Sequence, residues 1–232
     1  MLIEVKNLDV GYQDKQVVFG ASLKVDAGEF VALIGHNGAG KTTLLKTICG
    51  YLKTGVGEVL YKGEDITNLS PAVNVKKGLS FVHQEKCLFP NLSVLENLQL
   101  AAYAVGKTSD LQERLNEVYR LFPILEEREK QMADTLSGGQ QKQLAVGMAI
   151  LVRPDLLLLD EPSLGLSPNL VKDLGAVLKE ISEMGTAILL VEQNVKMAIS
   201  LAKRIYVMRT GQIILEDTHE NMMNRESLWD LF

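Results

Sequence analysis

The residues best suited to chemistry form a glycine-rich loop near the start of the chain. Gly35 to Thr42 read GHNGAGKT and match the pattern G-x-x-x-x-G-K-[ST]. Glycines allow a tight turn and a close approach of the backbone to a ligand, and N–H groups at the start of a helix bind phosphate oxygens. We expect Lys41 to contact the outer phosphates and Thr42 to offer its hydroxyl to Mg²⁺. The predicted nucleotide contacts are Gly35, His36, Asn37, Gly38, Ala39, Gly40, Lys41, Thr42 and Thr43.

Two acidic side chains follow an apolar run later in the chain. Residues 156–161 read LLLLDE, so Asp160 and Glu161 stand where a buried strand is expected to end. In folds with parallel strands, ligands bind beside the carboxyl ends of the strands. We expect Asp160 to hold Mg²⁺ through water and Glu161 to polarise an attacking water as the general base. Together with the catalytic charge of Lys41, this pair predicts hydrolysis of a phosphoanhydride.

A second anion-binding element is predicted at residues 136–140, which read LSGGQ. A serine and two glycines that open a helix form another helix N-terminus suited to an anion. The predicted ligand contacts of this segment are Ser137, Gly138, Gly139 and Gln140. A chain with two phosphate-binding elements favours an arrangement in which they meet across a dimer.

The elements that must position these residues alternate between strand and helix. Apolar runs between turn residues predict strands, and helical spacing or capping residues predict helices. The expected strands are 2–10, 17–25, 29–34, 57–61, 79–82, 156–160, 186–191, 205–208 and 212–215. The expected helices are 42–49, a short one starting at Ser70-Pro71, 139–152, 168–184 and one that ends near 202. This alternation implies an α/β fold with a mostly parallel sheet and helices on its faces.

Residues 91–129 have a helical character. Ser93 and Glu96 have the S-x-x-E spacing of a capping box. Apolar residues at helical spacing predict one buried helix face: Leu111, Leu115, Val118, Phe122 and Leu125. Pro123 is expected to end or kink that helix. We interpret the region as a helical lobe inserted in the α/β core, at approximately residues 91–150.

The overall charge and hydropathy exclude some classes of protein. Lys and Arg number 24 and Asp and Glu number 29, which gives a net charge of −5. A protein that coats nucleic acid needs a basic face, so no nucleic-acid partner is expected. The apolar stretch 145–152 is far shorter than the roughly 20 residues of a membrane span, and the first residues lack the pattern of a secretory signal. An apolar cluster within 228–232 is expected to pack on the core.

The segments GHNGAGKT, LSGGQ and LLLLDEP follow one another in the order found in ABC transporters. The sequence resembles the ATP-binding subunit of these transporters over essentially its whole length. The resemblance implies a single domain over 1–232, with a P-loop core, an N-terminal antiparallel β subdomain and an inserted helical subdomain. It also implies that two subunits, identical or homologous, sandwich two ATP molecules head to tail, with the P-loop of one facing Ser137 and Gly139 of the other. Hydrolysis would then let the dimer reopen.

Two further residues take roles through this resemblance. Tyr12 matches the aromatic residue that stacks on adenine. Gln84 matches the glutamine that senses Mg²⁺ and water and links the core to the helical lobe. The segment from Gln84 to Tyr103 should face the groove that receives a helix of the membrane permease. The subunit is thus expected to be peripheral, at the cytoplasmic face of the inner membrane, with an external substrate-binding protein as an indirect partner.

The sequence departs from the usual family pattern at two positions. Ser167 stands where many members have aspartate, although Ser167 before Pro168 still suits the start of a helix. Gln193 stands in place of the switch histidine, and its amide can donate to a γ-phosphate but cannot titrate. The segments DEPSLGLSP and LVEQN that carry these departures resemble the second ATPase subunit of branched-chain or hydrophobic amino acid importers.

We therefore expect an ATPase that powers the import of branched-chain or other hydrophobic amino acids. The ATPases of urea and short-amide importers share the same pattern and are the alternative. Lipopolysaccharide-export ATPases are similar overall but usually keep the histidine. A non-transport ABC ATPase of translation or DNA repair usually carries paired cassettes or long coiled-coil insertions, and neither is found in this sequence. Intact Lys41, Asp160 and Glu161 oppose an inactive regulatory protein.

Overall fold

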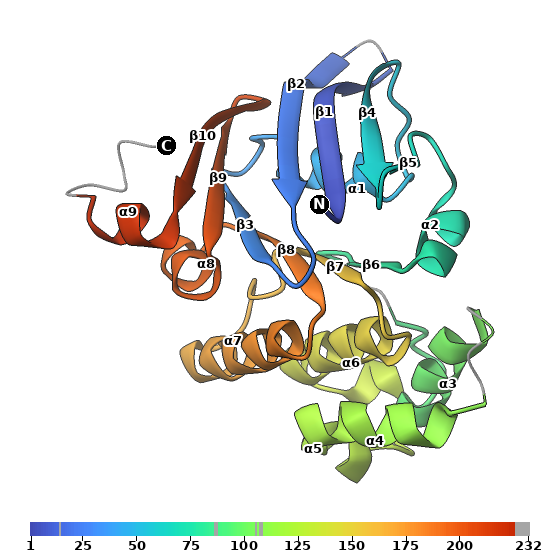
Figure 1. Cartoon of the computed structure of the whole chain (residues 1–232). Coiled ribbons are helices and arrows are strands. Elements are labelled where there is room, and N and C mark those ends of the chain that lie inside the picture. The colour runs from blue at the N-terminus through green and yellow to red at the C-terminus, as the bar shows by residue number, and fades with distance from the viewer. Residues whose placement is uncertain (14, 86–87, 105, 107–108, 226–232) are drawn as a thin grey trace.

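The structure is a computed structural model that describes residues 1–13, 15–85, 88–104, 106 and 109–225. These residues form two β-sheets with helices packed around them (Figure 1). The N-terminal sheet lies at the top of the view, and the helices between residues 94 and 151 lie at the bottom (Figure 1). The apolar cluster predicted within 228–232 lies outside the described residues.

The N-terminal sheet is antiparallel, with the strand order β2-β1-β4-β5. Its strands are β1 (Ile3–Tyr12), β2 (Lys15–Val25), β4 (Val56–Tyr61) and β5 (Glu64–Asp65). In β1 the side chains of Ile3, Val5 and Val10 are buried while their neighbours are more exposed. This alternation gives the sheet one apolar face, which packs on the core. We call it the antiparallel sheet.

The second sheet, called the main sheet here, has the strand order β10-β9-β3-β8-β7-β6 within the described residues. Its strands are β3 (Phe30–Ile34), β6 (Leu79–Val82), β7 (Leu156–Asp160), β8 (Ala187–Glu192), β9 (Arg204–Arg209) and β10 (Gln212–Thr218). The pairs β3–β8, β3–β9, β7–β8 and β6–β7 are parallel, and β10 is antiparallel to β9. The predicted α/β fold with a mostly parallel sheet is therefore confirmed.

Two apolar clusters cover the opposite faces of the main sheet. Leu157 and Leu159 of β7 belong to the cluster on the side of the helices, whereas Leu156 and Leu158 belong to the cluster beneath the antiparallel sheet. A strand with both faces covered is expected to be apolar throughout, and all residues of β7 are buried. This packing fixes the carboxyl end of β7, and with it the side chains that follow.

Several helices begin at a proline or at a capping residue that the sequence predicts. The helices are α1 (Lys41–Ile48), α2 (Pro71–Lys77), α3 (Val94–Ala104), α4 (Leu111–Leu121), α5 (Pro123–Glu127), α6 (Gly138–Leu151), α7 (Pro168–Glu183), α8 (Val195–Leu201) and α9 (His219–Met223), with a 3-10 turn at Ala133–Thr135. Pro71 and Pro168 each occupy the first position of a helix, as expected of proline. The predicted N-cap at Ser167 is confirmed, because its hydroxyl accepts the N–H of Leu170 at 3.5 Å.

Helices α3 to α6, called the helical lobe here, occupy the chain between β6 and β7. The predicted capping box is present, since the Ser93 N–H donates to the Glu96 carboxylate at 2.7 Å and the Glu96 N–H to the Ser93 hydroxyl at 3.2 Å. The predicted break at Pro123 is also present, between α4 and α5. The boundaries of a separate helical subdomain stay a prediction.

Short elements at the ends of longer ones were not predicted. The two residues of β5 pair with the end of β4, and α9 follows β10. Both are too short to leave a clear periodic pattern in the sequence. In the described part of the chain, none of the helices combines the length and apolar character that crossing a bilayer requires.

Candidate active site

The glycine-rich loop connects β3 to α1, and its backbone requires glycine. Gly38 and Gly40 have φ angles of 80° and 103°, in the left-handed region that favours glycine. At Gly35, a Cβ would lie 2.2 Å from the backbone oxygen of Met208. A cavity of about 320 Å³ is lined by Val17, Asn37, Gly38, Ala39, Gly40, Lys41, Thr42, Thr43, Gln84 and Glu161. The loop thus surrounds a cavity at the N-terminus of α1, where anions bind favourably.

Lys41 places its positive charge at the base of this cavity. Its side chain is 4% exposed, and its ammonium donates to the backbone oxygens of Gly35 at 2.8 Å and His36 at 3.1 Å. The same Nζ lies 3.2 Å from Oε1 of Glu161. Because both groups are buried, removing one partner would leave an uncompensated charge in the interior. The ion pair therefore binds the loop to the end of β7.

Asp160, the last residue of β7, presents an unused carboxylate oxygen. Its Oδ1 accepts the hydroxyl of Thr42 at 3.1 Å, and its buried Oδ2 has no hydrogen-bond partner among the described residues. Burial raises the pKa of the Asp160 carboxyl, the hydrogen bond from Thr42 opposes this, and the charge of Glu161 adds to it. A hydroxyl and a carboxylate oxygen without a partner are donors that hard divalent cations prefer. These residues fit Mg²⁺.

Glu161 lies between two cavities. Its N–H donates to the Val191 oxygen at 2.9 Å, and its Oε2 accepts the amide of Gln84 at 3.1 Å. Its φ angle of 47° is rare for a residue with a side chain. Glu161 lines the cavity at the glycine-rich loop and also a cavity of about 290 Å³ lined by Gln193. The Glu161 carboxylate thus lies at the P-loop cavity, in contact with Lys41 and Gln84.

The LSGGQ segment forms the exposed start of α6. The Ser137 hydroxyl accepts the N–H of Gln140 at 3.4 Å, and the Gln140 side-chain oxygen accepts the N–H of Ser137 at 3.0 Å. This capping box occupies the side chain of Gln140. Ser137 and Gly138 are exposed, and none of residues 137–140 lines the cavity at the glycine-rich loop. The two predicted anion-binding elements are therefore separate within one chain.

Comparison with known proteins places this arrangement in a family. Residues 18–164 match the model of the ABC transporter family. The chain belongs to the ABC transporter family. It is 38% identical to the high-affinity branched-chain amino acid transport ATP-binding protein BraG of Pseudomonas aeruginosa, over 95% of this chain and 94% of BraG. It is 35% identical to the probable branched-chain amino acid transport ATP-binding protein LivF of Archaeoglobus fulgidus, over 97% and 95% of the two chains.

Other members of the ABC transporter family are similar too. The lipopolysaccharide export system ATP-binding protein LptB of Haemophilus influenzae is 31% identical over 98% of this chain and 95% of LptB. A nucleotide-free ATP-binding cassette from an ABC transporter superimposes with a TM-score of 0.87 at 26% identity, covering 99% of this chain and 98% of that one. A dimeric bacterial ABC transporter cassette gives a TM-score of 0.84 at 26% identity, with 94% and 99% covered.

These similarities confirm the predicted family, fold class and activity. The chain is an ABC ATPase, which binds and hydrolyses ATP. Of the residues predicted for the site, the structure brings together the P-loop from Asn37 to Thr43 with Gln84, Asp160 and Glu161. Gln193 lies in the adjoining cavity. Tyr12, at the end of β1, is 44% exposed and does not line the P-loop cavity.

Three residues at this site of the ABC ATPase are not among those predicted from the sequence. Val17 of β2 lines the P-loop cavity. Lys142 of α6 donates to the backbone oxygen of Gln84 at 2.6 Å and so connects the helix of LSGGQ to the site. Glu192, the last residue of β8, is buried beside Gln193. A signal existed for Glu192, because it is an acid at the end of an apolar strand, as Asp160 is.

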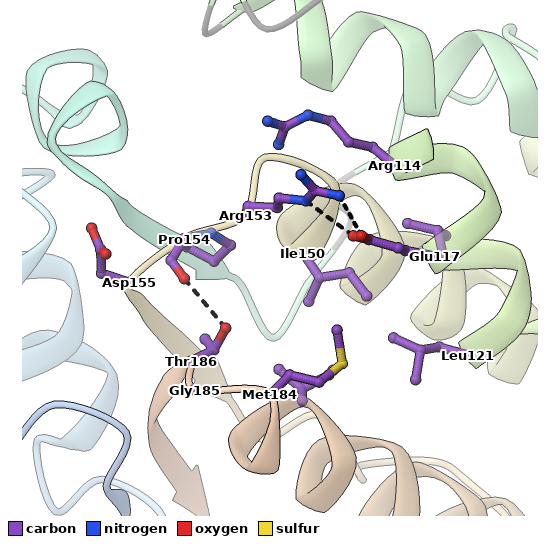
Figure 2. Close-up of a pocket in the computed structure, with 12 residues that line it drawn as sticks. Arg114, Glu117, Leu121, Ile150, Arg153, Pro154, Asp155, Met184, Gly185 and Thr186 are labelled. Atoms are coloured by element: carbon purple, nitrogen blue, oxygen red, sulfur yellow. Dashed lines mark hydrogen bonds and ion pairs between the residues drawn. The ribbon is translucent and has the colours of Figure 1, made fainter. Parts of the chain in front are cut away.

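A further cavity of the ABC ATPase, of about 420 Å³, lies at the amino ends of β7 and β8 (Figure 2). We call this end of the main sheet the amino edge, and the end that carries the P-loop and the acidic pair the carboxyl edge. The cavity is bordered by the connections that enter β7 and β8 and by the helices α4, α6 and α7. Figure 2 shows Arg153 directed at Glu117, and its Nε donates to the carboxylate at 3.1 Å. Thr186 donates to the Pro154 oxygen at 3.3 Å. Both hydrogen bonds join elements of the fold, while the buried Nε of Arg114 in the same cavity has no hydrogen-bond partner among the described residues.

Proposed function

We propose that this ABC ATPase powers the import of branched-chain or other hydrophobic amino acids. The observation that supports the mechanism best is the convergence of Lys41, Thr42, Asp160, Glu161 and Gln84 on the P-loop cavity. The observation that supports the substrate is the similarity to BraG and LivF, whose names state branched-chain amino acid transport.

In the proposed reaction the triphosphate lies on the N–H groups of the P-loop, with Lys41 on its outer phosphates. Thr42 and Asp160 would hold Mg²⁺, with Gln84 beside them, and the ion would neutralise charge on the phosphate oxygens. Glu161 accepts the proton of the attacking water as general base. Gln193 donates its amide to the γ-phosphate from the adjoining loop.

We propose that hydrolysis takes place in a head-to-tail pair of ATPase subunits. Ser137, Gly138, Gly139 and Gln140 of one subunit would meet the γ-phosphate bound by the P-loop of the other. The exposure of Ser137 and Gly138 at the start of α6, and the absence of all four residues from the lining of their own P-loop cavity, support this arrangement. The similarity to a dimeric cassette supports it as well. Tyr12 is proposed to stack on the adenine base.

The partner in the membrane is proposed to be a permease that docks beside the helical lobe. A cavity of about 700 Å³ there is lined in part by Gln84, Leu88 and Leu164. The adjoining Phe89 is 50% exposed, and the buried Asn97 holds its backbone by accepting its N–H at 2.8 Å and donating to its oxygen at 3.0 Å. An apolar side chain on a fixed backbone suits a docking site. Docking would place the subunit at the cytoplasmic face of the membrane, in indirect contact with an external substrate-binding protein.

The helical lobe is proposed to act as an inserted subdomain, covering approximately residues 91–150, within a single domain over 1–232. The hydrogen bond from Lys142 to Gln84 supports a connection between this lobe and the hydrolysis site. Such a connection would let closure of the ATP-bound dimer reach the permease.

Purification of the tagged chain from detergent-solubilised membranes of its own cells tests the transport role. We expect a permease to co-purify, and the reconstituted complex to take up leucine with ATP. Uptake of urea or a short amide would support the alternative importer. Co-purification with lipopolysaccharide-export components, in line with the similarity to LptB, would contradict the import proposal.

A further inference from the structure

Glu192 is a buried acid to which the proposed mechanism assigns no role. Glu192 is the last residue of β8 and is 1% exposed. In the main sheet β8 lies between β3 and β7, with Glu192 paired to Ile34 and Val191 paired to Asp160. Glu192 therefore ends its strand at the same edge as the P-loop and the acidic pair.

The two oxygens of the Glu192 carboxylate bind two different loops. Oε1 accepts the N–H of Ser163, at 3.0 Å, in the loop that follows Glu161. Oε2 accepts the N–H of Asn194, at 3.2 Å, next to Gln193. Hydrogen bonds from N–H groups to a buried carboxylate are stronger than those between neutral groups. A single side chain thus joins the two loops.

The two loops that Glu192 joins are the loop that follows Glu161 and the loop that contains Gln193, and both line one cavity. The cavity of about 290 Å³ is lined by Glu161, Ser163, Glu192, Gln193 and Asn194, together with Leu164 and Gly165. Neither Ser163 nor Asn194 offers its own side chain to the carboxylate, since both contacts are through backbone N–H groups. The backbone at both points therefore donates to the same acceptor group.

We propose that Glu192 is a positioning residue for ATP hydrolysis. Its carboxylate holds the backbone after Glu161 and the backbone beside Gln193 at a fixed separation, so that the general base and the γ-phosphate donor face one water. This inference rests on the roles proposed above for Glu161 and Gln193. Small displacements of catalytic groups are costly, since an error of about 1 Å can lower a rate by about a hundredfold.

The chemistry of the position favours a carboxylate over its amide analogue. A carboxylate accepts hydrogen bonds at both oxygens, whereas a glutamine side chain offers one acceptor and one donor. With glutamine at this position, one of the two backbone N–H groups would face an NH₂ group instead of an oxygen. One loop would then be released while the volume of the side chain stays the same.

The test is the Glu192→Gln variant, assayed for ATP hydrolysis and for ATP binding. We expect kcat to fall by about tenfold or more while KM and Kd for ATP stay within about twofold of wild type, because the P-loop contacts are not altered. An unchanged kcat would overturn the proposal. A parallel loss of kcat and ATP affinity would also overturn it, since that result indicates a general structural role.

Glu29→Gln is the matched control. The Glu29 carboxylate likewise accepts a backbone N–H, that of Asp26 at 2.8 Å, and also binds Arg204 at 2.8 Å, but it precedes β3 at the opposite edge of the main sheet. We expect this variant to lower the unfolding temperature with kcat and KM unchanged. A fall in kcat as large as that of Glu192→Gln would show that loss of any partly or fully buried carboxylate at a strand end has this effect.

Glu192→Asp tests the proposal if the glutamine variant does not fold. Aspartate keeps the charge but is shorter by one methylene, so we expect kcat to fall by about threefold to tenfold with ATP affinity kept. Wild-type kcat in this variant, or failure of both variants to fold, would overturn the proposal. Glu161→Gln is assayed alongside: hydrolysis in that variant would refute the proposed mechanism itself, whereas its loss together with normal Glu192→Gln would refute only the inference about Glu192.

Discussion

At the carboxyl edge of the main sheet Lys41, Asp160 and Glu161 are 4%, 1% and 6% exposed, whereas at the amino edge the side chains of Arg153 and Asp155 are 37% and 50% exposed. The two edges belong to the same strands, because β7 begins just after Asp155 and ends at Asp160. Charge is thus buried at one end of a strand and left in contact with water at the other.

The partners of the charges differ in the same way. At the amino edge Arg153 binds the carboxylates of Glu113 and Glu117, and Asp155 binds Lys62 at 2.7 Å. At the carboxyl edge the buried Oδ2 of Asp160 has no hydrogen-bond partner among the described residues. An unsatisfied buried oxygen is costly. The ion pairs at the amino edge join elements of the fold, whereas the unpartnered oxygen of Asp160 lies beside Thr42, which lines the P-loop cavity. We therefore interpret the carboxyl edge as arranged for a ligand.

The largest effect is predicted for replacing Glu161, the proposed general base at the carboxyl edge. We expect Glu161→Gln to lower kcat for ATP hydrolysis by about 10² to 10⁴-fold, the usual contribution of general base catalysis. ATP binding should remain, because Lys41 and the P-loop are kept, and the ATP-bound dimer should accumulate. Steady-state assays and size-exclusion chromatography with ATP measure both. Normal turnover in this variant would remove Glu161 from the mechanism.

A smaller effect is expected when Lys41, the cation at the same edge, is replaced. Lys41→Ala removes a charged hydrogen-bond donor, worth about 1.5–3 kcal/mol, so ATP affinity should fall by roughly 10-fold to 150-fold. Titration with a fluorescent ATP analogue measures this. Lys46→Ala, later in α1 and outside the P-loop cavity, is the matched control and should bind ATP normally. Equal affinities in the two variants would contradict the role of Lys41.

Gln193→Ala should have a more moderate effect. Loss of the amide donor is expected to lower kcat by about tenfold with KM for ATP kept, because the side chain acts on the γ-phosphate during the reaction. Gln193→His supplies another donor and should recover most of the rate. Single-turnover hydrolysis measures both variants. A wild-type rate for Gln193→Ala would mean that this exposed glutamine serves the structure alone.

The smallest effect on catalysis is expected at the amino edge. Arg153→Ala removes partly exposed ion pairs worth about 1 kcal/mol, which should lower the unfolding temperature by about 2–4 °C in a chain of this size. Thermal unfolding and hydrolysis assays are compared, and kcat and KM should stay within about twofold of wild type. Glu113→Gln, which removes one partner, should shift the transition less. A large loss of activity in Arg153→Ala would break the contrast between the edges.

Local patterns made much of this molecule predictable. The P-loop, β7 and the capping box at Ser93 each depend on residues adjacent in sequence, so their spacing alone predicts them. The same holds for the break in the helical lobe at Pro123, because proline lacks the N–H that a helix requires.

The missed features depend on which strands lie side by side. Glu192 reaches the site because β8 lies between β3 and β7, and no local pattern shows that order. Val17 comes from the antiparallel sheet, which only the tertiary packing brings to the P-loop. The cavity that contains Arg153 requires three helices and two strand connections to meet. The roles of Tyr12 and of the LSGGQ segment stay predictions, because they concern a ligand and a second subunit.

The backbone at Glu161 has a consequence for how this chain varies in evolution. Its φ angle of 47° costs about 1–3 kcal/mol for a residue with a side chain, and glycine would adopt it without that cost. Glycine there would relieve this strain, but it would also leave the buried ammonium of Lys41 without its carboxylate partner, which costs about 3–5 kcal/mol. The carboxylate that neutralises Lys41 thus offsets the strain of its own backbone, so selection for stability and selection for turnover both retain an acid at this position.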